Sequence, residues 1–248
     1  MITAIVHMFN EEYLLPFWIE HHRRIFSHVI FIDYHSTDKS LDIIRQQAPT
    51  WEIRTTTTSQ WDAKRDDDEV MEIERSISGF KIALNITDFF LPGSSIEELV
   101  NKGDVQKLHV FTVCSSNETD NEPSTMCEIL QNIERAQPEI RGYRFLHSRE
   151  DGKYHLGRHD SYHLAIWSKA AIVWLGFYPW TERMIQRKLQ FAKKMSQCDI
   201  NMGAGLQHLW SRKEMEERHH KCCREMPALD AYPALQHNIQ SFIDTYLS

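Results

Sequence analysis

The chain has 248 residues, of which 42% are hydrophobic and 25% charged. This is ordinary globular usage and argues against a disordered or fibrous protein. The length suffices for one α/β domain with a large core. The net charge of -7 argues against a general nucleic-acid binder, because neutralising phosphates requires clustered Lys and Arg.

The number of cysteines and the lengths of the apolar runs indicate where in the cell the protein is expected. Five cysteines form an odd, mostly scattered set that does not resemble a secreted disulfide framework. We find neither a signal-peptide pattern at the N-terminus nor about 18 consecutive apolar residues anywhere. We therefore expect a cytoplasmic protein without a membrane span, which either acts in the cytosol or meets a membrane peripherally.

The first half of the chain alternates between strand and helix patterns. The apolar run 4–9 predicts a buried strand, and Asn10-Glu11-Glu12 then suits the start of a helix. Runs 28–33, 51–57 and 80–86 predict further strands, with helices over 40–47 and 66–80. This alternation is typical of a parallel sheet with helices on both faces.

The second half is less regular. We expect strands over 105–114 and 170–177, helices over 125–136, 181–195, 211–224 and 232–247, and a polar, irregular stretch over 142–157. We expect a single domain over 1–248. It would consist of a nucleotide-binding half over about 1–100, an acceptor and metal half over about 101–210, and a helical tail over 211–248.

Polar residues gather where the predicted strands end, at Asn10, Asp33, Ser36, Asp38 and Asp88. Parallel sheets bind ligands beyond the carboxyl ends of their strands, where an acid can accept a hydrogen bond from a ribose hydroxyl. Ser36-Thr37-Asp38 could instead cap the helix that begins near Ser40, and the two roles are compatible.

Two motifs resemble a known family. The segment 8–22 contains Asn10-Glu11 and the pattern W-x-x-H-H, and the segment 31–40 contains D-x-x-S-T-D-x-S. Together they resemble the N-terminal half of family 2-like GT-A glycosyltransferases. The resemblance covers residues 1 to about 92 and, more weakly, 155–163, 178–188 and 203–208. It implies a GT-A fold, with a mostly parallel, Rossmann-like central sheet flanked by helices; the tail over 211–248 adds helices at the C-terminus.

The resemblance also implies a donor site. In the family the corresponding positions bind the base, ribose and phosphates of a nucleoside-diphosphate sugar, and a uridine donor is favoured. Here those positions are Asn10, Glu11, Asp33, Ser36 and Asp38.

A metal site is implied as well. The family's D-x-D motif grips Mg²⁺ or Mn²⁺, ions that prefer hard oxygen ligands. The matching segment here is Ile86-Thr87-Asp88, in which Ile86 replaces the first acid and only Asp88 remains. His208 is the expected second ligand, because the family often returns a C-terminal histidine to the metal.

Three further groups are candidates for the donor pocket. Arg158, His159 and His163 are expected on a substrate-facing loop; a zinc site of His155, His159 and His163 is the alternative, but Gly152 and Gly157 interrupt the helix it needs. Trp180 can stack on a sugar, while Arg187 and Lys188 can neutralise a diphosphate. Asp67 and Glu74 share a helix face that could line the pocket. For the last two groups the alternative is an ordinary core or solvated position.

The resemblance thus predicts a metal-assisted, inverting transfer of a sugar to a hydroxyl of a glycan, lipid or protein. An inverting transfer needs a carboxylate base, for which Glu182 and Asp160 are the candidates. The competing hypothesis is a non-catalytic GT-A module that binds nucleotide or glycan. A nucleotidyltransferase is disfavoured, because the segment 8–13 has no glycine and no basic residue.

Overall fold

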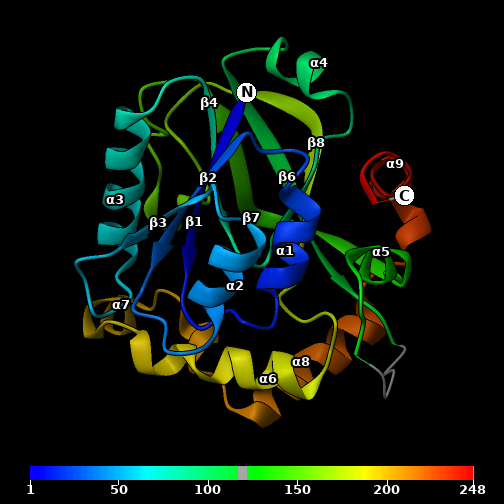
Figure 1. Cartoon of the computed structure of the whole chain (residues 1–248). Helices are drawn as coiled ribbons and strands as arrows, with labels where there is room; N and C mark the ends of the chain where they lie inside the picture. The colour runs from blue at the N-terminus through cyan, green and yellow to red at the C-terminus, as the bar shows by residue number, and fades with distance from the viewer. Residues whose placement is uncertain (117–121, 248) are drawn as a thin grey trace.

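A computed structural model describes residues 1–116 and 122–247, and one eight-stranded sheet forms its centre (Figure 1). The strands are β1 (Ile2–Met8), β2 (His28–Asp33), β3 (Glu52–Thr55), β4 (Phe80–Asn85), β5 (Asp88–Leu91), β6 (Val105–Cys114), β7 (Arg135–His147) and β8 (Ile166–Trp174). Their order across the sheet is β3-β2-β1-β4-β7-β6-β8-β5. Neighbours are parallel from β3 to β4 and between β6 and β8, whereas β7 and β5 run antiparallel to their neighbours.

Helices cover both faces of this sheet. They are α1 (Leu15–His22), α2 (Ser40–Gln47), α3 (Ala63–Ser76), α4 (Ile96–Val100), α5 (Met126–Gln131), α6 (Glu182–Leu189), α7 (Gln197–Met202), α8 (Arg212–Glu225) and α9 (Pro233–Phe242). The expected α/β fold, a mostly parallel central sheet flanked by helices with a helical C-terminal segment, is confirmed.

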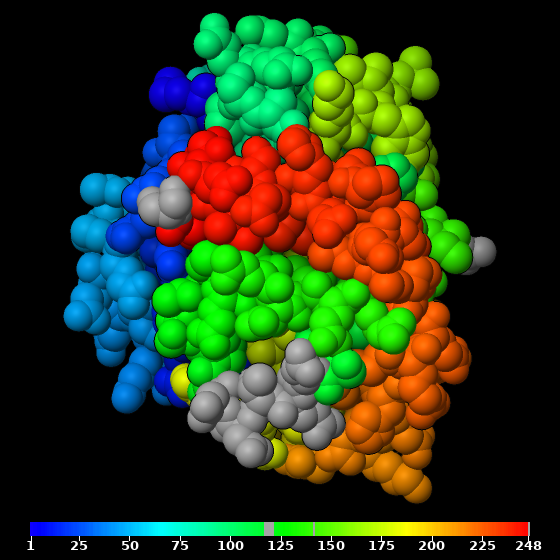
Figure 2. Space-filling view, turned by 90° about the vertical axis from the view of Figure 1, so that its right-hand side faces the viewer, coloured from blue at the N-terminus to red at the C-terminus, as the bar shows by residue number. Residues whose placement is uncertain are grey.

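Strand β2 shows why the sheet has two covered faces. Its successive side chains point to opposite sides, so Phe31 packs in the core that contains Trp18 of α1, while Ile30 and Ile32 pack in the core that contains Val70 of α3. Because both sides are buried, the strand reads as a continuous apolar run. Helix α9 completes the first core, and Figure 2 shows its red segment lying along the green segment that contains α5.

Several element boundaries differ from the expectation. The first helix begins at Leu15 rather than at Asn10, with Pro16 in its first turn. The expected helix over 125–136 ends at Gln131, and β7 then runs to His147, through part of the stretch expected to be irregular. Arg144 and His147 are buried polar residues within that strand, so its apolar pattern is masked in the sequence.

The carboxyl ends of three parallel strands meet at one edge of the sheet. Met8 of β1 is in register with Asp33 of β2, and His7 is in register with Asn85 of β4. Asp88 follows within three residues and begins β5, a strand that the sequence pattern did not predict. In Figure 1, α6, α7 and α8 lie beyond this edge.

Among the described residues, no helix combines the length and apolar character that crossing a membrane requires.

Candidate functional site

The loops after β1 and β2 are tied together at the carboxyl edge. Asn10 adopts a left-handed φ of 51°, and its backbone N–H donates to Ser36 Oγ at 3.0 Å. The N–H of Glu12 donates to Asp38 Oδ2 at 3.0 Å, and the N–H of Ser36 donates to Asp33 Oδ1 at 3.0 Å. Asn10, Ser36, Asp38 and Asp33 thus fix the shape of the edge.

Helix α6 is anchored to this edge by a buried ion pair. Arg187 donates from Nε and Nη2 to the two carboxylate oxygens of Glu11, both at 2.5 Å. The side chains are only 7% and 2% exposed. Burial raises the pKa of Glu11, and the charge of Arg187 opposes that rise. The sequence-predicted residues Glu11 and Arg187 are therefore brought together.

The side chain of Lys188, the next residue of α6, makes neither a hydrogen bond nor an ion pair with the described residues. Its Nζ lies 4.3 Å from the ring centroid of Phe177 and 5.6 Å from that of Trp174, and Trp174 is the register partner of Asp88 in the sheet. Burial and the charge of Arg187 lower the pKa of Lys188 to about 7. Lys188 is thus an uncommitted amine beside the start of β5.

His208 lies near the same helix. Its ring centroid is 5.3 Å from that of Phe191. Burial, Lys188 and Arg187 lower the pKa of His208 to about 4. The charged neighbours that influence His208 are therefore two cations of α6, Arg187 and Lys188.

Asp88 is completely buried and is bound by an arginine that the sequence analysis missed. Its Oδ2 accepts from the N–H of Asn85 at 2.9 Å and from Nε of Arg144 at 2.8 Å. Its Oδ1 has no hydrogen-bond partner within the described residues. Arg144 comes from β7 and also donates from Nη1 to the carbonyl of Tyr143 at 3.0 Å. The sequence offers no motif around Arg144 that could have revealed it.

A third buried ion pair joins α3 to the loop before β8. Arg158, with a φ of 57°, donates from Nη1 to Asp67 Oδ1 at 2.7 Å and from Nη2 to Asn85 Oδ1 at 3.4 Å. The N–H of Gly157 donates to Asp67 Oδ2 at 2.7 Å. Burial raises the pKa of Asp67, and Arg158 opposes that rise. Asp67 and Arg158 thus meet at the end of β4.

His159 lies close to two of these ion pairs, Asp88–Arg144 and Asp67–Arg158. It keeps solvent access, yet desolvation together with the charges of Arg144 and Arg158 lowers its pKa to about 4, against the influence of Asp88. Arg144, Arg158 and Asp88 are therefore close enough to act on one imidazole.

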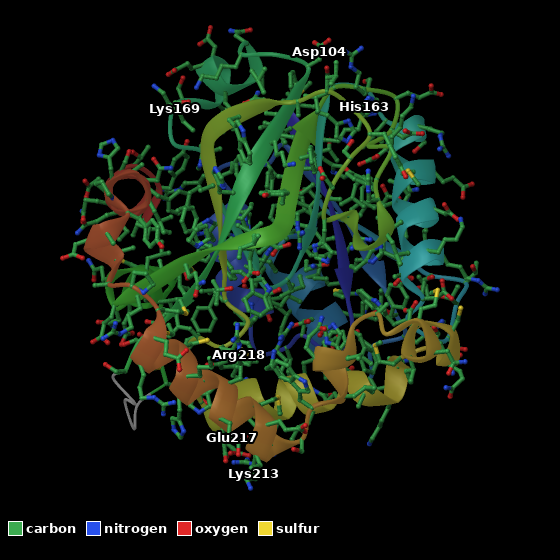
Figure 3. All side chains as sticks on the ribbon, turned by 180° about the vertical axis from the view of Figure 1, so that it is seen from behind. Asp104, His163, Lys169, Lys213, Glu217 and Arg218 are labelled. Carbon is green, nitrogen blue, oxygen red and sulfur yellow. The ribbon has the colours of Figure 1, made fainter. Side chains whose placement is uncertain are left out.

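Other predicted site residues lie elsewhere. Glu74 is buried seven residues after Asp67, about 10 Å further along α3. Its carboxylate accepts hydrogen bonds from Tyr154 Oη at 2.7 Å and from the N–H of Gly152 at 2.6 Å. His163 contacts the carbonyl of Asp151 at 2.9 Å. Figure 3 shows His163 at the end of the molecule opposite to α8. The structure thus does not bring Glu74 and His163 to the carboxyl edge.

The predicted bases and the predicted stacking residue have other partners. Glu182 is exposed and forms an ion pair with Arg212 of α8. Asp160 pairs with Lys107 at 3.1 Å. Trp180 stacks on His219 of α8, with ring centroids 4.4 Å apart. None of the three forms a hydrogen bond or an ion pair with Asp88 among the described residues.

A divalent ion does not fit the residues around Asp88. Mg²⁺ and Mn²⁺ prefer several oxygen ligands, whereas Asp88 shares its carboxylate with Arg144, and His208 lies with Lys188 and Arg187. Because Arg144 neutralises Asp88, the pair offers an ion no net negative charge, and a guanidinium roughly 5 Å from a dication would offset about 7 kcal/mol of the attraction to the carboxylate at an effective dielectric constant of 20. In the ranges 1–116 and 122–247, no group of three His, Cys, Asp or Glu side chains is arranged to hold an ion. We therefore assign no chemical step to a metal.

Comparisons with solved structures give remote likenesses. No protein-family model matches the chain, and no curated protein matches it. Among solved structures, the chain is similar to glucosyl-3-phosphoglycerate synthase from Mycobacterium tuberculosis, crystallised with Mn²⁺, UDP and phosphoglyceric acid. That match has 15% identity and a TM-score of 0.33, and covers 45% of this chain but only 43% of the synthase.

Two further solved structures are matched over more of their length. Residues 1–349 of S. aureus TarS match with 14% identity and a TM-score of 0.41, over 99% of this chain and 80% of that one. HddC from Yersinia pseudotuberculosis matches with 10% identity and a TM-score of 0.40, over 71% and 94% respectively. Likenesses at this level do not carry an activity from one protein to another.

Proposed function

We propose that the chain is a glycosyltransferase of the GT-A kind. It moves a sugar from a nucleoside diphosphate, with uridine favoured, to a hydroxyl group of a glycan, lipid or protein. The observation that carries the proposal is the gathering of Lys188 and the pairs Arg144–Asp88, Arg158–Asp67 and Arg187–Glu11 around the carboxyl edge of one sheet. Such edges bind nucleotides in α/β proteins.

The diphosphate of the donor would meet Lys188 first. Because this amine has no carboxylate partner among the described residues, an incoming phosphate does not have to displace one. Its burial strengthens the attraction between the two charges, since the local dielectric constant is lower than that of water. We therefore expect Lys188 to contribute to binding the diphosphate.

The nucleobase has an aromatic surface available nearby. The ring of Trp61 lies 5.1 Å from Tyr34, 5.5 Å from His7 and 6.0 Å from Phe191, measured between centroids. Trp61 remains partly exposed, and aromatic rings of this kind stack on planar ligands. Asp33, at the end of β2, would then accept a hydrogen bond from the ribose or the base.

The test is binding followed by turnover. Isothermal titration with UDP, GDP, CDP and ADP is expected to show binding that favours UDP. Lys188→Met should weaken it on the order of tenfold or more, as expected for one lost charge-assisted hydrogen bond. Lys213→Met, an exposed change on α8, is the matched control. If none of the four nucleotides binds, the proposal is wrong.

A non-catalytic module is the second candidate. It is favoured by the ion pairs that join Glu182 to Arg212 and Asp160 to Lys107, because a carboxylate held by a cation is a weaker base. The inverting outcome stays a prediction for the same reason. Release of free UDP from a panel of UDP-sugars, with alcohols and simple glycosides as acceptors, would support the enzyme. Nucleotide binding without any release would support the module.

A further inference from the structure

The carboxylate that the family motif would give to a metal already has a cationic partner. Asp88 is completely buried, and the side chain of Arg144 is 7% exposed. The guanidinium donates from Nε to Asp88 and from Nη1 to the carbonyl of Tyr143. Nη2 has no hydrogen-bond partner within the described residues. Unlike Asp88 Oδ1, this unpaired atom is not completely buried. Arg144 is thus held on two sides and keeps one accessible donor.

We propose that Arg144 is the cation that faces the donor diphosphate, so that this chain transfers its sugar without a divalent metal ion. Asp88 would act as a positioning residue that orients the guanidinium. The inference rests on the proposed function. It differs from the family motif, in which the acid binds the ion directly.

The charges at the edge agree with this role. Four cations, Arg144, Arg158, Arg187 and Lys188, are set against three carboxylates, Asp88, Asp67 and Glu11. The three ion pairs are each neutral, so Lys188 is the one cation of this set without a carboxylate partner among the described residues; Asp33 and Asp38 at the same edge accept backbone N–H groups. A donor diphosphate brings two negative charges, which arginine and lysine can meet with charge-assisted hydrogen bonds.

The transfer step places new charge where Arg144 would act. The bond between the anomeric carbon and the diphosphate oxygen breaks, and its electron pair stays on that oxygen. A bond forms between the anomeric carbon and the acceptor oxygen, whose proton leaves to solvent or to a base. The departing nucleoside diphosphate thus gains one negative charge, and a fixed guanidinium stabilises it more than it stabilises the intact donor.

The experiment measures UDP binding and UDP-sugar turnover in excess EDTA and in MnCl₂. The wild-type protein is expected to bind UDP and to turn over the donor equally well in both. Arg144→Gln should weaken UDP binding on the order of 10- to 100-fold in EDTA, the effect of one lost charge-assisted hydrogen bond. Arg144→Lys should restore part of it, because the charge is kept while the planar fork is lost.

A matched control comes from the same strand region. Arg149 follows the end of β7, is 53% exposed and pairs with Asp104 at 3.2 Å. Figure 3 places Asp104 at the end of the molecule far from α8. Arg149→Gln therefore removes the same charge away from the edge and should leave UDP binding unchanged.

Asp88 separates the two mechanisms. If Asp88 bound a metal, Arg144→Gln would free its carboxylate and strengthen Mn²⁺ binding, while Asp88→Asn would abolish it. If Arg144 is the cation, the double variant Asp88→Asn/Arg144→Gln should still bind UDP more weakly than the wild type in EDTA, because the guanidinium is lost whether or not the carboxylate remains. Because both side chains of the double variant are neutral, no unpaired charge is buried. The test therefore remains valid even if Arg144→Gln alone unfolds the protein.

The outcomes distinguish this inference from the proposed function. UDP binding in EDTA that depends on Arg144 supports it. UDP binding or turnover that requires Mn²⁺ overturns it and leaves the glycosyltransferase proposal standing. Binding of UDP in neither buffer refutes both.

Discussion

The ion pair between Glu11 and Arg187 allows a quantitative prediction about stability. Both side chains are at least 93% buried, and two hydrogen bonds join them. Glu11→Gln leaves the guanidinium buried without a counter-charge, which costs about 3–5 kcal/mol. For a chain of this size that loss corresponds to a fall in Tm of about 6–20 °C.

The reverse change should cost less. Arg187→Gln leaves Glu11 buried, but burial already raises the pKa of this carboxyl. It can therefore take up a proton and become neutral, which an arginine cannot do at neutral pH. The double variant should lose less stability than the two single losses added together, because the residues are in direct contact.

Thermal and urea unfolding at pH 7 measure these effects. Glu182→Gln is the control, since it breaks the exposed pair with Arg212 at the start of the same helix. Its Tm should stay close to the wild-type value. If Glu11→Gln lowers the Tm no further than Glu182→Gln, the reasoning from burial is refuted.

Three other predictions concern buried ionisable groups. Burial and Arg187 lower the pKa of Lys188 to about 7 in the folded protein, whereas a lysine in the unfolded chain has a pKa of about 10.4. Between about pH 7 and 10.4 the unfolded chain therefore binds more protons than the folded protein. Wild-type stability should therefore rise with pH across that window relative to Lys188→Met, and UDP-glucose affinity should fall as the amine deprotonates; equal pH profiles for both proteins would contradict this. Burial raises the pKa of Asp66 to about 7, so stability should fall by up to about 4 kcal/mol between pH 4 and 7, and Asp66→Asn should remove that fall in urea titrations. Glu74→Gln should cost about 1–3 kcal/mol through its lost hydrogen bonds and leave UDP affinity unchanged; a large loss of affinity would place Glu74 in the donor site after all.

The sequence predicted the fold better than it predicted the site, for a physical reason. Buried parallel strands such as β2 are continuous apolar runs, and helix α3 repeats Val70 and Ile73 at helical spacing. Both patterns are local in the chain. Strand β7 lacks such a pattern because the buried polar side chains of Arg144 and His147 interrupt it, and their partners lie 56 and 73 residues away.

The same distinction explains which candidate residues the structure brought together. Asn10, Ser36 and Asp38 belong to motifs whose geometry is local to two loops, and they do meet at the edge. Glu74 is a candidate because it shares a helix face with Asp67. Helix α3 runs along the sheet, so a separation of seven residues takes Glu74 about 10 Å away from the carboxyl edge.

The replacement at Ile86 and the position of Arg144 have a common electrostatic explanation. A motif with two acids has two negative charges, which match one divalent ion. With Ile86 in place of the first acid, Asp88 contributes one charge, which one guanidinium neutralises completely. Ile86 itself is 1% exposed and packs in the apolar core. The side chain at position 86 therefore points into the core rather than toward a diphosphate, and the single carboxylate beside it matches an arginine in charge as well as in geometry.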